Sequence, residues 1–292
     1  MRLLVTGGSG FLGGYVLREA ARRGHETVAL ARTAAAASTV AARGAKPITG
    51  DLDAARRLGE TFAAAQCDGL VNLASLGFGH GPAIVAAAEQ AGISRAIFVS
   101  TTAVTTTLAA PTKAVRLAAE ERIRSSGLDW TILRPTMIYG APGDRNLSRL
   151  LALLARTPVL PVPGGGGHLQ QPVHVADLAG AVLAAAERPG TAGSCYDIAG
   201  PQAQALGELL TISARAVASR TRFIPVPLAP VIVVARGYEQ LSRRPRIRAE
   251  QLQRLAEDKA FVIEDAVREL DYAPRTFAAG IRAEAQALGL AR

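Results

Sequence analysis

The first residues with a clear chemical capacity are the glycines of Thr6–Gly13, which reads TGGSGFLG. They follow a short apolar run and open a helical pattern. Glycines at this spacing allow a tight turn and a close approach of the backbone to a pyrophosphate, while the first N–H groups of the helix bind the anion. The stretch therefore predicts a dinucleotide-binding site with contacts from Thr6, Gly7, Gly10, Phe11, Leu12 and Gly13.

The end of the second predicted strand indicates which dinucleotide is bound. A site for NAD places a carboxylate there to accept hydrogen bonds from the ribose, whereas a guanidinium pairs with the 2′-phosphate of NADP. This chain has Arg32 and no acid in Val28–Thr33. We therefore expect NADP(H) in preference to NAD(H), with an ordinary surface role for Arg32 as the alternative. After the third strand, Asp51 and Leu52 are placed to contact the adenine, although Asp51 as a helix cap is the alternative.

Short apolar runs alternate with helical patterns, which is typical of parallel strands joined by crossover helices. The sequence predicts a doubly wound α/β fold of the Rossmann type with a smaller substrate-binding lobe. Predicted strands lie at 2–5, 27–30, 47–49, 70–73, 96–100, 130–133 and 195–198, and predicted helices include 82–91, 111–125 and 175–186.

The predicted dinucleotide-binding core comprises residues 1–140 and 172–200, and the predicted lobe comprises residues 141–171 and 201–292. The lobe begins where the pattern becomes irregular. Residues 158–167 contain three prolines and four glycines, which predicts a loop because such a sequence holds neither a helix nor a central strand.

Composition narrows the function classes. With 49% hydrophobic residues among 292, the chain can bury a sizeable core. The net charge of +9 is spread along the chain, and the densest basic run, 242–248, lacks aromatic residues, so we expect a solvated face and no nucleic-acid partner. No apolar run reaches the roughly 20 residues that cross a bilayer. Two cysteines, Cys67 and Cys195, fit a reducing compartment and exclude a disulfide framework, so we expect a cytoplasmic protein.

Seven stretches together resemble the extended and atypical short-chain dehydrogenase/reductases, which include the NAD-dependent epimerase/dehydratases. They are the glycine stretch, the segments 50–52, 72–75, 99–101, 133–140 and 171–178, and the tail 269–275. The resemblance spans nearly the whole chain and is specific for a fold more than for a reaction. It implies further cofactor contacts from Leu73, Ala74, Ser75, Ser100, Pro135, Thr136 and Met137.

Ordinary members of the family carry a serine or threonine after strand five and a Tyr-x-x-x-Lys on the next helix. The tyrosine transfers a proton, and the lysine lowers the pKa of the tyrosine and holds the nicotinamide ribose. Thr101 falls on the serine position and Lys113, one of three lysines in the chain, on the lysine position, but Ala109 replaces the tyrosine. Thr101 and Lys113 are therefore the predicted catalytic residues, and the source of the proton stays open.

Two side chains are candidates to replace the tyrosine. Tyr139 lies in the motif after strand six, with packing at the cleft wall as the alternative. His80 lies in a glycine-rich loop after strand four, and histidine can exchange a proton near neutral pH.

The resemblance also bears on the substrate. Family members that act on nucleotide sugars use an asparagine and an arginine where this chain has Met137 and Gln170, so a less charged or lipid-linked carbonyl compound becomes competitive. We expect an NADP(H)-dependent oxidoreductase, either a reductase or an epimerase/dehydratase-like enzyme, that acts on a small molecule and is compatible with a homodimer. The alternative is a structural or redox-sensing protein that binds NADP(H) without turnover.

Overall fold

The computed structural model describes residues 1–108, 111–141, 143–242, 253 and 257–291. Ala109 and the greater part of the basic run 242–248 fall outside the described residues. The chain divides into two units, each of which has its own core. Unit 1 contains Met1–Thr136, Val175–Ile198 and Val262–Ala273, and unit 2 contains Met137–His174, Ala199–Phe261 and Pro274–Arg292.

Unit 1 is built on seven strands in the order β11-β6-β5-β4-β1-β2-β3, and every neighbouring pair is parallel. The strands are β1 (Arg2–Thr6), β2 (Glu26–Ala31), β3 (Lys46–Thr49), β4 (Gly69–Asn72), β5 (Arg95–Val99), β6 (Asp129–Pro135) and β11 (Ser194–Ile198). The order reverses between β1 and β4, which is where ligands bind in open parallel sheets. The predicted Rossmann-type fold is confirmed.

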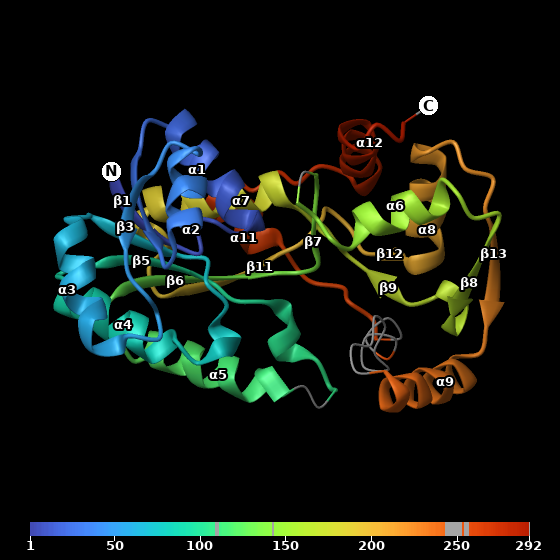
Figure 1. The fold of residues 1–292 in the computed structure, drawn as a ribbon, viewed down its shortest axis with the longest axis horizontal. Coiled ribbons are helices and arrows are strands. Elements are labelled where there is room, and N and C mark those ends of the chain that lie inside the picture. The colour runs from blue at the N-terminus through green and yellow to red at the C-terminus, as the bar shows by residue number, and fades with distance from the viewer. Residues whose placement is uncertain (109–110, 142, 243–252, 254–256, 292) are drawn as a thin grey trace. The chain divides into compact units, whose positions relative to one another are not determined.

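Helices cover both faces of this sheet (Figure 1). One face carries α1 (Phe11–Arg22), α2 (Ala34–Ala41), α7 (Val175–Glu187) and α11 (Glu264–Leu270), and the other carries α3 (Ala55–Ala65), α4 (Gly81–Gln90) and α5 (Pro111–Arg124). Because both faces are covered, the central strands are buried, and all five residues of β5 are buried, four of them apolar. One of the cores packs Phe62 of α3 and Ile123 of α5 with Phe98 of β5.

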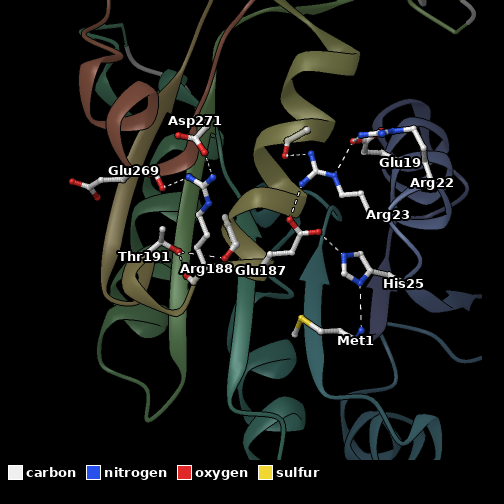
Figure 2. Close-up of polar contacts among 12 residues, drawn as sticks. Met1, Glu19, Arg22, Arg23, His25, Glu187, Arg188, Thr191, Glu269 and Asp271 are labelled. Atoms are coloured by element: carbon white, nitrogen blue, oxygen red, sulfur yellow. Dashed lines mark hydrogen bonds and ion pairs between the residues drawn. The ribbon is translucent and has the colours of Figure 1, made fainter.

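The amino ends of the strands meet in a dense set of polar contacts, the amino-edge network, formed by Arg23, His25, Arg95, Glu187 and Arg188. Figure 2 shows Arg23 and His25 converging on the Glu187 carboxylate, at 2.7 Å and 2.6 Å. Arg95 is only 8% exposed and donates to Thr131 Oγ1 at 2.8 Å, Thr191 Oγ1 at 2.6 Å and the carbonyl oxygens of residues 129 and 185. These contacts join α7 to β5, to β6 and to the turn between α1 and β2 at one edge of the sheet.

The segment before α12 differs from the predicted boundaries. Residues 262–273 were placed in the lobe by the sequence, but α11 packs on α7 and β11 of unit 1. Arg188 donates to the carbonyl oxygen of Glu269 at 2.7 Å and pairs with Asp271, and the Tyr196 hydroxyl donates to the Glu269 carboxylate. These bonds between residues about 80 positions apart are invisible to local patterns.

Unit 2 consists of strand pairs and helices. Its strands pair as β7 (Ile138–Tyr139) with β10 (Val173–His174), β9 (Leu169–Gln170) with β12 (Gln204–Ala205), and β8 (Val159–Pro163) with β13 (Arg222–Val226). Its helices are α6 (Leu147–Leu154), α8 (Leu206–Ala216), α9 (Leu228–Leu241) and α12 (Phe277–Ala287), and its core includes Tyr139, Leu151, Leu209, Phe277 and Ile281.

The prediction of a loop for residues 158–167 is wrong in its first half, because β8 forms a strand there and the 3₁₀ helix η3 (Gly164–Gly166) follows. A two-stranded pair explains the difference. Each strand has one unpaired edge, where the missing N–H of a proline breaks no ladder bond.

Among the residues that the structure describes, no helix is both long and apolar enough to traverse a lipid bilayer.

Candidate functional site

The glycine stretch forms a cradle at the carboxyl end of β1 that larger residues could not form. Gly7 has φ +71°, and a Cβ on it would lie 2.9 Å from the backbone nitrogen of Ala74. A Cβ on Gly13 would lie 2.5 Å from the carbonyl oxygens of both Gly7 and Gly8. Gly10 is the N-cap of α1, so the N–H groups of Phe11 and Leu12 stand in the first turn, where they have no partner within the helix. This arrangement fits a pyrophosphate, which needs close backbone approach and unpaired donors.

Two hydroxyls that were predicted to contact the cofactor have protein partners instead. Thr6 Oγ1 donates to Asn72 Oδ1 at 2.6 Å, and Asn72 Nδ2 donates to the Ala74 carbonyl oxygen at 3.1 Å. These bonds join the ends of β1 and β4 on the two sides of the switch point. Ser100 Oγ donates to Glu120 Oε1 at 2.7 Å. While these bonds hold, the Thr6 and Ser100 hydroxyls have only acceptor lone pairs left for a cofactor.

A pocket of about 380 Å³ adjoins the cradle. Its lining brings together several residues that the sequence singled out separately: Gly7, Arg32, Asp51, Leu52, Ala74 and His80. They come from the ends of β1, β2, β3 and β4, which are neighbours in the sheet. The pocket lies where the adenosine half of a dinucleotide would continue from a pyrophosphate on the cradle.

Three charged or titratable side chains stand together in this pocket. Asp53 has one carboxylate oxygen 3.8 Å from Arg32 Nη1 and the other 3.7 Å from His80 Nδ1. Arg32 and Asp53 are 67% and 69% exposed, and His80 is 20% exposed. The structure therefore places His80 beside Arg32, in a pocket whose lining does not include Lys113. Asp53 was not predicted, because an acid near a helix start is ordinarily a cap.

Asp51 is not the cap of α3, whose N-cap is Ala54, and its contact with adenine stays a prediction. Its carboxylate accepts a hydrogen bond from the Asp53 backbone N–H at 3.1 Å, which shapes the turn before α3, and it also lines the pocket.

Lys113 and Thr101 lie at the two ends of one loop. Thr101 Oγ1 accepts from the Ala103 backbone N–H at 3.2 Å and caps the 3₁₀ helix η2 (Thr102–Thr105). Lys113 Nζ, from the first turn of α5, donates to the carbonyl oxygen of Thr106 at 2.5 Å. An ammonium has three donors, so Lys113 can hold this loop and still donate to a ligand. Ala109, in the tyrosine position, lies outside the described residues.

A buried ion pair fixes α5 on the sheet behind this loop. Glu120 of α5 is fully buried, and its carboxylate accepts hydrogen bonds from Ser100 and from both Nε and Nη2 of Arg134 on β6. Burial alone would raise the pKa of Glu120, but the hydrogen bonds from Arg134 and Ser100 outweigh it and hold the pKa below its ordinary value. The pair orients the helix that carries Lys113.

The remaining predicted residues follow β6. Thr102 Oγ1 donates to the Pro135 carbonyl oxygen at 3.3 Å, and the Thr136 N–H donates to Ile198. Met137 and Tyr139 belong to unit 2, where Met137 is 38% exposed. Tyr139 is 1% exposed and packs against His174 and Phe277, and a Cβ on Gly280 would lie 2.1 Å from its hydroxyl oxygen. The structure thus supports the packing alternative for Tyr139 more than the proton donor.

Besides Asp53, the structure adds a second residue that sequence reasoning missed. Arg43, which follows α2, donates from Nη1 to the carbonyl oxygens of Gly8 at 2.7 Å and Gly10 at 2.9 Å. A Cβ on Gly14 would lie 2.9 Å from the Arg43 guanidinium carbon, so the side chain lies directly on the cradle. Burial lowers the pKa of Arg43, with Arg18 adding repulsion. In a chain with so many arginines, no sequence signal distinguishes this one.

Comparisons with known proteins agree with this site. The sequence pattern of a family described as NAD(P)H-binding matches residues 7–189. The 4-hydroxy-2-methyl-3-oxo-4-farnesyl-3,4-dihydroquinoline-1-oxide ketoreductase of Stigmatella aurantiaca is 30% identical, over 94% of this chain and 92% of that one. Subunit 9 of the NADH dehydrogenase (ubiquinone) 1 alpha subcomplex of Arabidopsis thaliana is 31% identical over 52% of this chain and 38% of its own length. The ceramide reductase of Caulobacter vibrioides is 31% identical over 63% and 61%.

Among solved structures, the UDP-glucose 4-epimerase of Thermus thermophilus in complex with NAD superimposes with a TM-score of 0.73 at 20% identity, over 99% of both chains. At that identity the likeness shows the fold alone. The family match covers most of the chain, and together with the glycine cradle at the switch point it confirms the resemblance to the atypical short-chain dehydrogenase/reductases. The chain belongs to the NAD(P)H-binding family.

Proposed function

We propose that this protein is an NADPH-dependent reductase that acts on a ketone carried by a molecule with a long apolar part. The observation that carries the proposal is the glycine cradle with its adjoining pocket, which fits a dinucleotide in both backbone shape and donors. The similarity to a ketoreductase over nearly the full length of both chains supports the reaction class.

Arg32 supports the choice of NADPH. Its guanidinium lines the pocket and is 67% exposed. Its contact with Asp53, at 3.8 Å, is too long for a hydrogen bond. A guanidinium in this position can pair with both charges of a 2′-phosphate. We expect Arg32→Ala to weaken NADPH binding about 30-fold, because the variant loses the group that pairs with the 2′-phosphate. NADH binding should weaken less than about twofold, because NADH has no 2′-phosphate.

The control for Arg32→Ala is Arg156→Ala, which removes an exposed arginine of unit 2. Calorimetric titration of each variant with both nucleotides measures the effect. Equal losses of NADPH and NADH affinity in Arg32→Ala would remove Arg32 from phosphate recognition.

The proposed substrate class rests on two observations. Two relatives are named for a farnesylated ketone and for a ceramide. Gln170, in the position where nucleotide-sugar enzymes carry an arginine, is buried, and its side chain donates to the Glu257 carbonyl oxygen and accepts from Lys259 Nζ. The glutamine side chain is a neutral amide, so it offers no charge to a diphosphate.

The roles of the residues follow from their positions. When bound, the nicotinamide supplies the hydride. Lys113 would hold the ribose and stabilise negative charge on the carbonyl oxygen, while Thr101 would donate a hydrogen bond to that oxygen. Because position 109 is an alanine, the proton would reach the oxygen from the Lys113 ammonium, directly or through a water.

Stopped-flow measurement of NADPH oxidation with ketones of increasing chain length, and with a nucleotide sugar, tests the proposal. We expect turnover only with ketones and a rising kcat/KM as the apolar chain lengthens. Lys113→Ala should lower kcat by about 10²-fold or more, whereas Lys46→Ala, a matched change at the exposed start of β3, should not. Ala109→Tyr should raise kcat.

The runner-up is a protein that holds NADP(H) without turnover, and the similarity to a respiratory-complex subunit over about half of this chain favours it. If no ketone accelerates NADPH oxidation and the nucleotide copurifies without exchanging, this second function replaces the first.

A further inference from the structure

The Asp53 carboxylate faces two basic side chains of unit 1 without a hydrogen bond to either. It lies between two basic side chains, with 3.8 Å to Arg32 Nη1 and 3.7 Å to His80 Nδ1. Both distances exceed the range of a hydrogen bond, roughly 2.7 to 3.2 Å. Asp53 thus gives the two basic groups a nearby negative charge without committing either of them to a bond.

Each of the three side chains is held near this point by its own element. Arg32 directly follows β2. Asp53 lies in the turn where the Asp51 carboxylate accepts a hydrogen bond from the Asp53 N–H. His80 is the N-cap of α4, its carbonyl oxygen accepts from the Ile84 N–H at 3.0 Å, and its ring packs edge-to-face on Phe78. Three independent loops therefore converge on one position in the pocket.

We propose that Arg32 and His80 together form the subsite for the 2′-phosphate of NADP, and that Asp53 is the internal anion that this phosphate displaces. The proposal rests on the NADP preference proposed above and extends it to two residues. A phosphate has the same sign of charge as the carboxylate and presents more oxygens, so it can bond to both basic groups where Asp53 bonds to neither. With NAD bound, Asp53 would stay and accept a hydrogen bond from the ribose, as carboxylates do in NAD sites.

The affinities of NADPH and NADH, measured by calorimetry, test the roles of both Asp53 and His80. Asp53→Asn should strengthen NADPH binding about fivefold and weaken NADH binding about twofold, because it removes a competing charge and a ribose acceptor. Glu60→Gln removes an exposed carboxylate from α3 and is the matched control, with changes below about twofold for both nucleotides.

His80→Gln should lower the NADPH-to-NADH affinity ratio by about fivefold, because it removes one of the two basic groups that face the phosphate. His168→Gln, a partly exposed histidine of unit 2, is the control.

The outcomes separate this inference from the proposed function. If the wild type binds NADPH no better than NADH and Arg32→Ala changes nothing, the NADP preference itself fails. If NADPH binding depends on Arg32 but Asp53→Asn and His80→Gln leave the NADPH-to-NADH affinity ratio within about twofold of wild type, the preference stands and the shared subsite is overturned.

Discussion

The two edges of the seven-stranded sheet carry similar side chains in different states. At the amino edge, Arg23 and His25 meet Glu187 at 2.7 Å and 2.6 Å, and the buried Arg95 is bonded to four acceptors. At the carboxyl edge, Arg32, Asp53 and His80 stand 3.7 to 3.8 Å apart around a pocket. Charges that bond to one another stabilise the fold, and charges held near one another without bonds are available to a ligand.

The difference has a physical cause. A buried charge without partners loses its hydration and raises the energy of the fold, so the buried Arg95 needs its four acceptors, although its Nε has none among the described residues. The carboxyl edge is solvated, and water satisfies its charges until a ligand replaces the water. We therefore expect mutations at the amino edge to change stability and mutations at the carboxyl edge to change nucleotide affinity.

The largest effect should come from Gly13→Ala at the carboxyl edge. The new Cβ would lie 2.5 Å from two carbonyl oxygens, so the start of α1 would have to move and the cradle would open. We expect NADPH affinity to fall about 1,000-fold, which corresponds to about 4 kcal/mol. Gly127→Ala is the control, since no atom lies within 4 Å of its Cβ position. Calorimetric titration measures the NADPH affinity of both variants. An unchanged affinity in Gly13→Ala would show that the cradle does not bind the nucleotide.

Arg95→Met should give the largest loss of stability. Methionine fills a similar volume but leaves two carbonyl oxygens and two threonine hydroxyls without their shared donor. We expect the free energy of unfolding to fall by about 4 kcal/mol. Urea denaturation measures it. NADPH affinity of the folded variant should stay within about twofold of wild type, and a large loss of affinity would contradict the division between the two edges.

Glu284 of unit 2 sharpens the comparison, because this carboxyl group is buried without a cation. It is 1% exposed, and burial, with repulsion from Asp144, raises its pKa to about 7, although Ser148 donates to it at 2.6 Å. Its ordinary pKa is 4.5. The stabilisation by the protonated form is complete below pH 4.5 and is lost as pH rises through about 7.

Glu284→Gln should therefore be more stable than wild type at pH 8, by roughly 3 kcal/mol, and about equal to it at pH 4. Thermal or urea unfolding at the two pH values tests this. A wild-type stability that does not fall between pH 5 and 8, relative to the variant, would contradict a raised pKa.

Glu187→Gln should have the smallest effect and the opposite dependence on pH. Burial alone would raise the pKa of Glu187, but hydrogen bonds with His25 and Arg23 hold it below its ordinary value. Its stabilisation is present above pH 4.5 and is lost as pH falls through the lower folded pKa. We expect a cost of about 1 kcal/mol at pH 7 that shrinks as pH falls below 4.5, measured by urea unfolding. Glu121→Gln, 78% exposed, is the control and should be neutral.

The sequence predicted unit 1 well because its signals are local. Each strand of the sheet is an apolar run, and the glycine stretch must start a helix wherever it occurs, so the strands lie within one or two residues of their predicted bounds. Unit 2 was harder to predict. The strand β8 pairs with β13, about 60 residues later, and no local pattern encodes a partner at that distance.

The same reasoning explains which site residues were found. Arg32 and Asp51 follow recognisable strands, and the pocket contains both. Asp53 and Arg43 act through contacts across the fold, so their residue types alone carried no signal. For His80, the sequence indicated the correct loop, but only the sheet order places that loop beside Arg32. Roles for Thr101 and Lys113 in turnover stay predictions.

The contact of Arg43 with the cradle limits how this cofactor site can be redesigned. Exchanging nucleotide preference by grafting β2 and α2 from another protein would treat that segment as a separate module. Here the residue after α2 holds the carbonyl oxygens of Gly8 and Gly10, so the graft would also replace a support of the pyrophosphate turn. A transplant that keeps position 43 as arginine should preserve binding, whereas one that loses it should give a protein that binds neither nucleotide well.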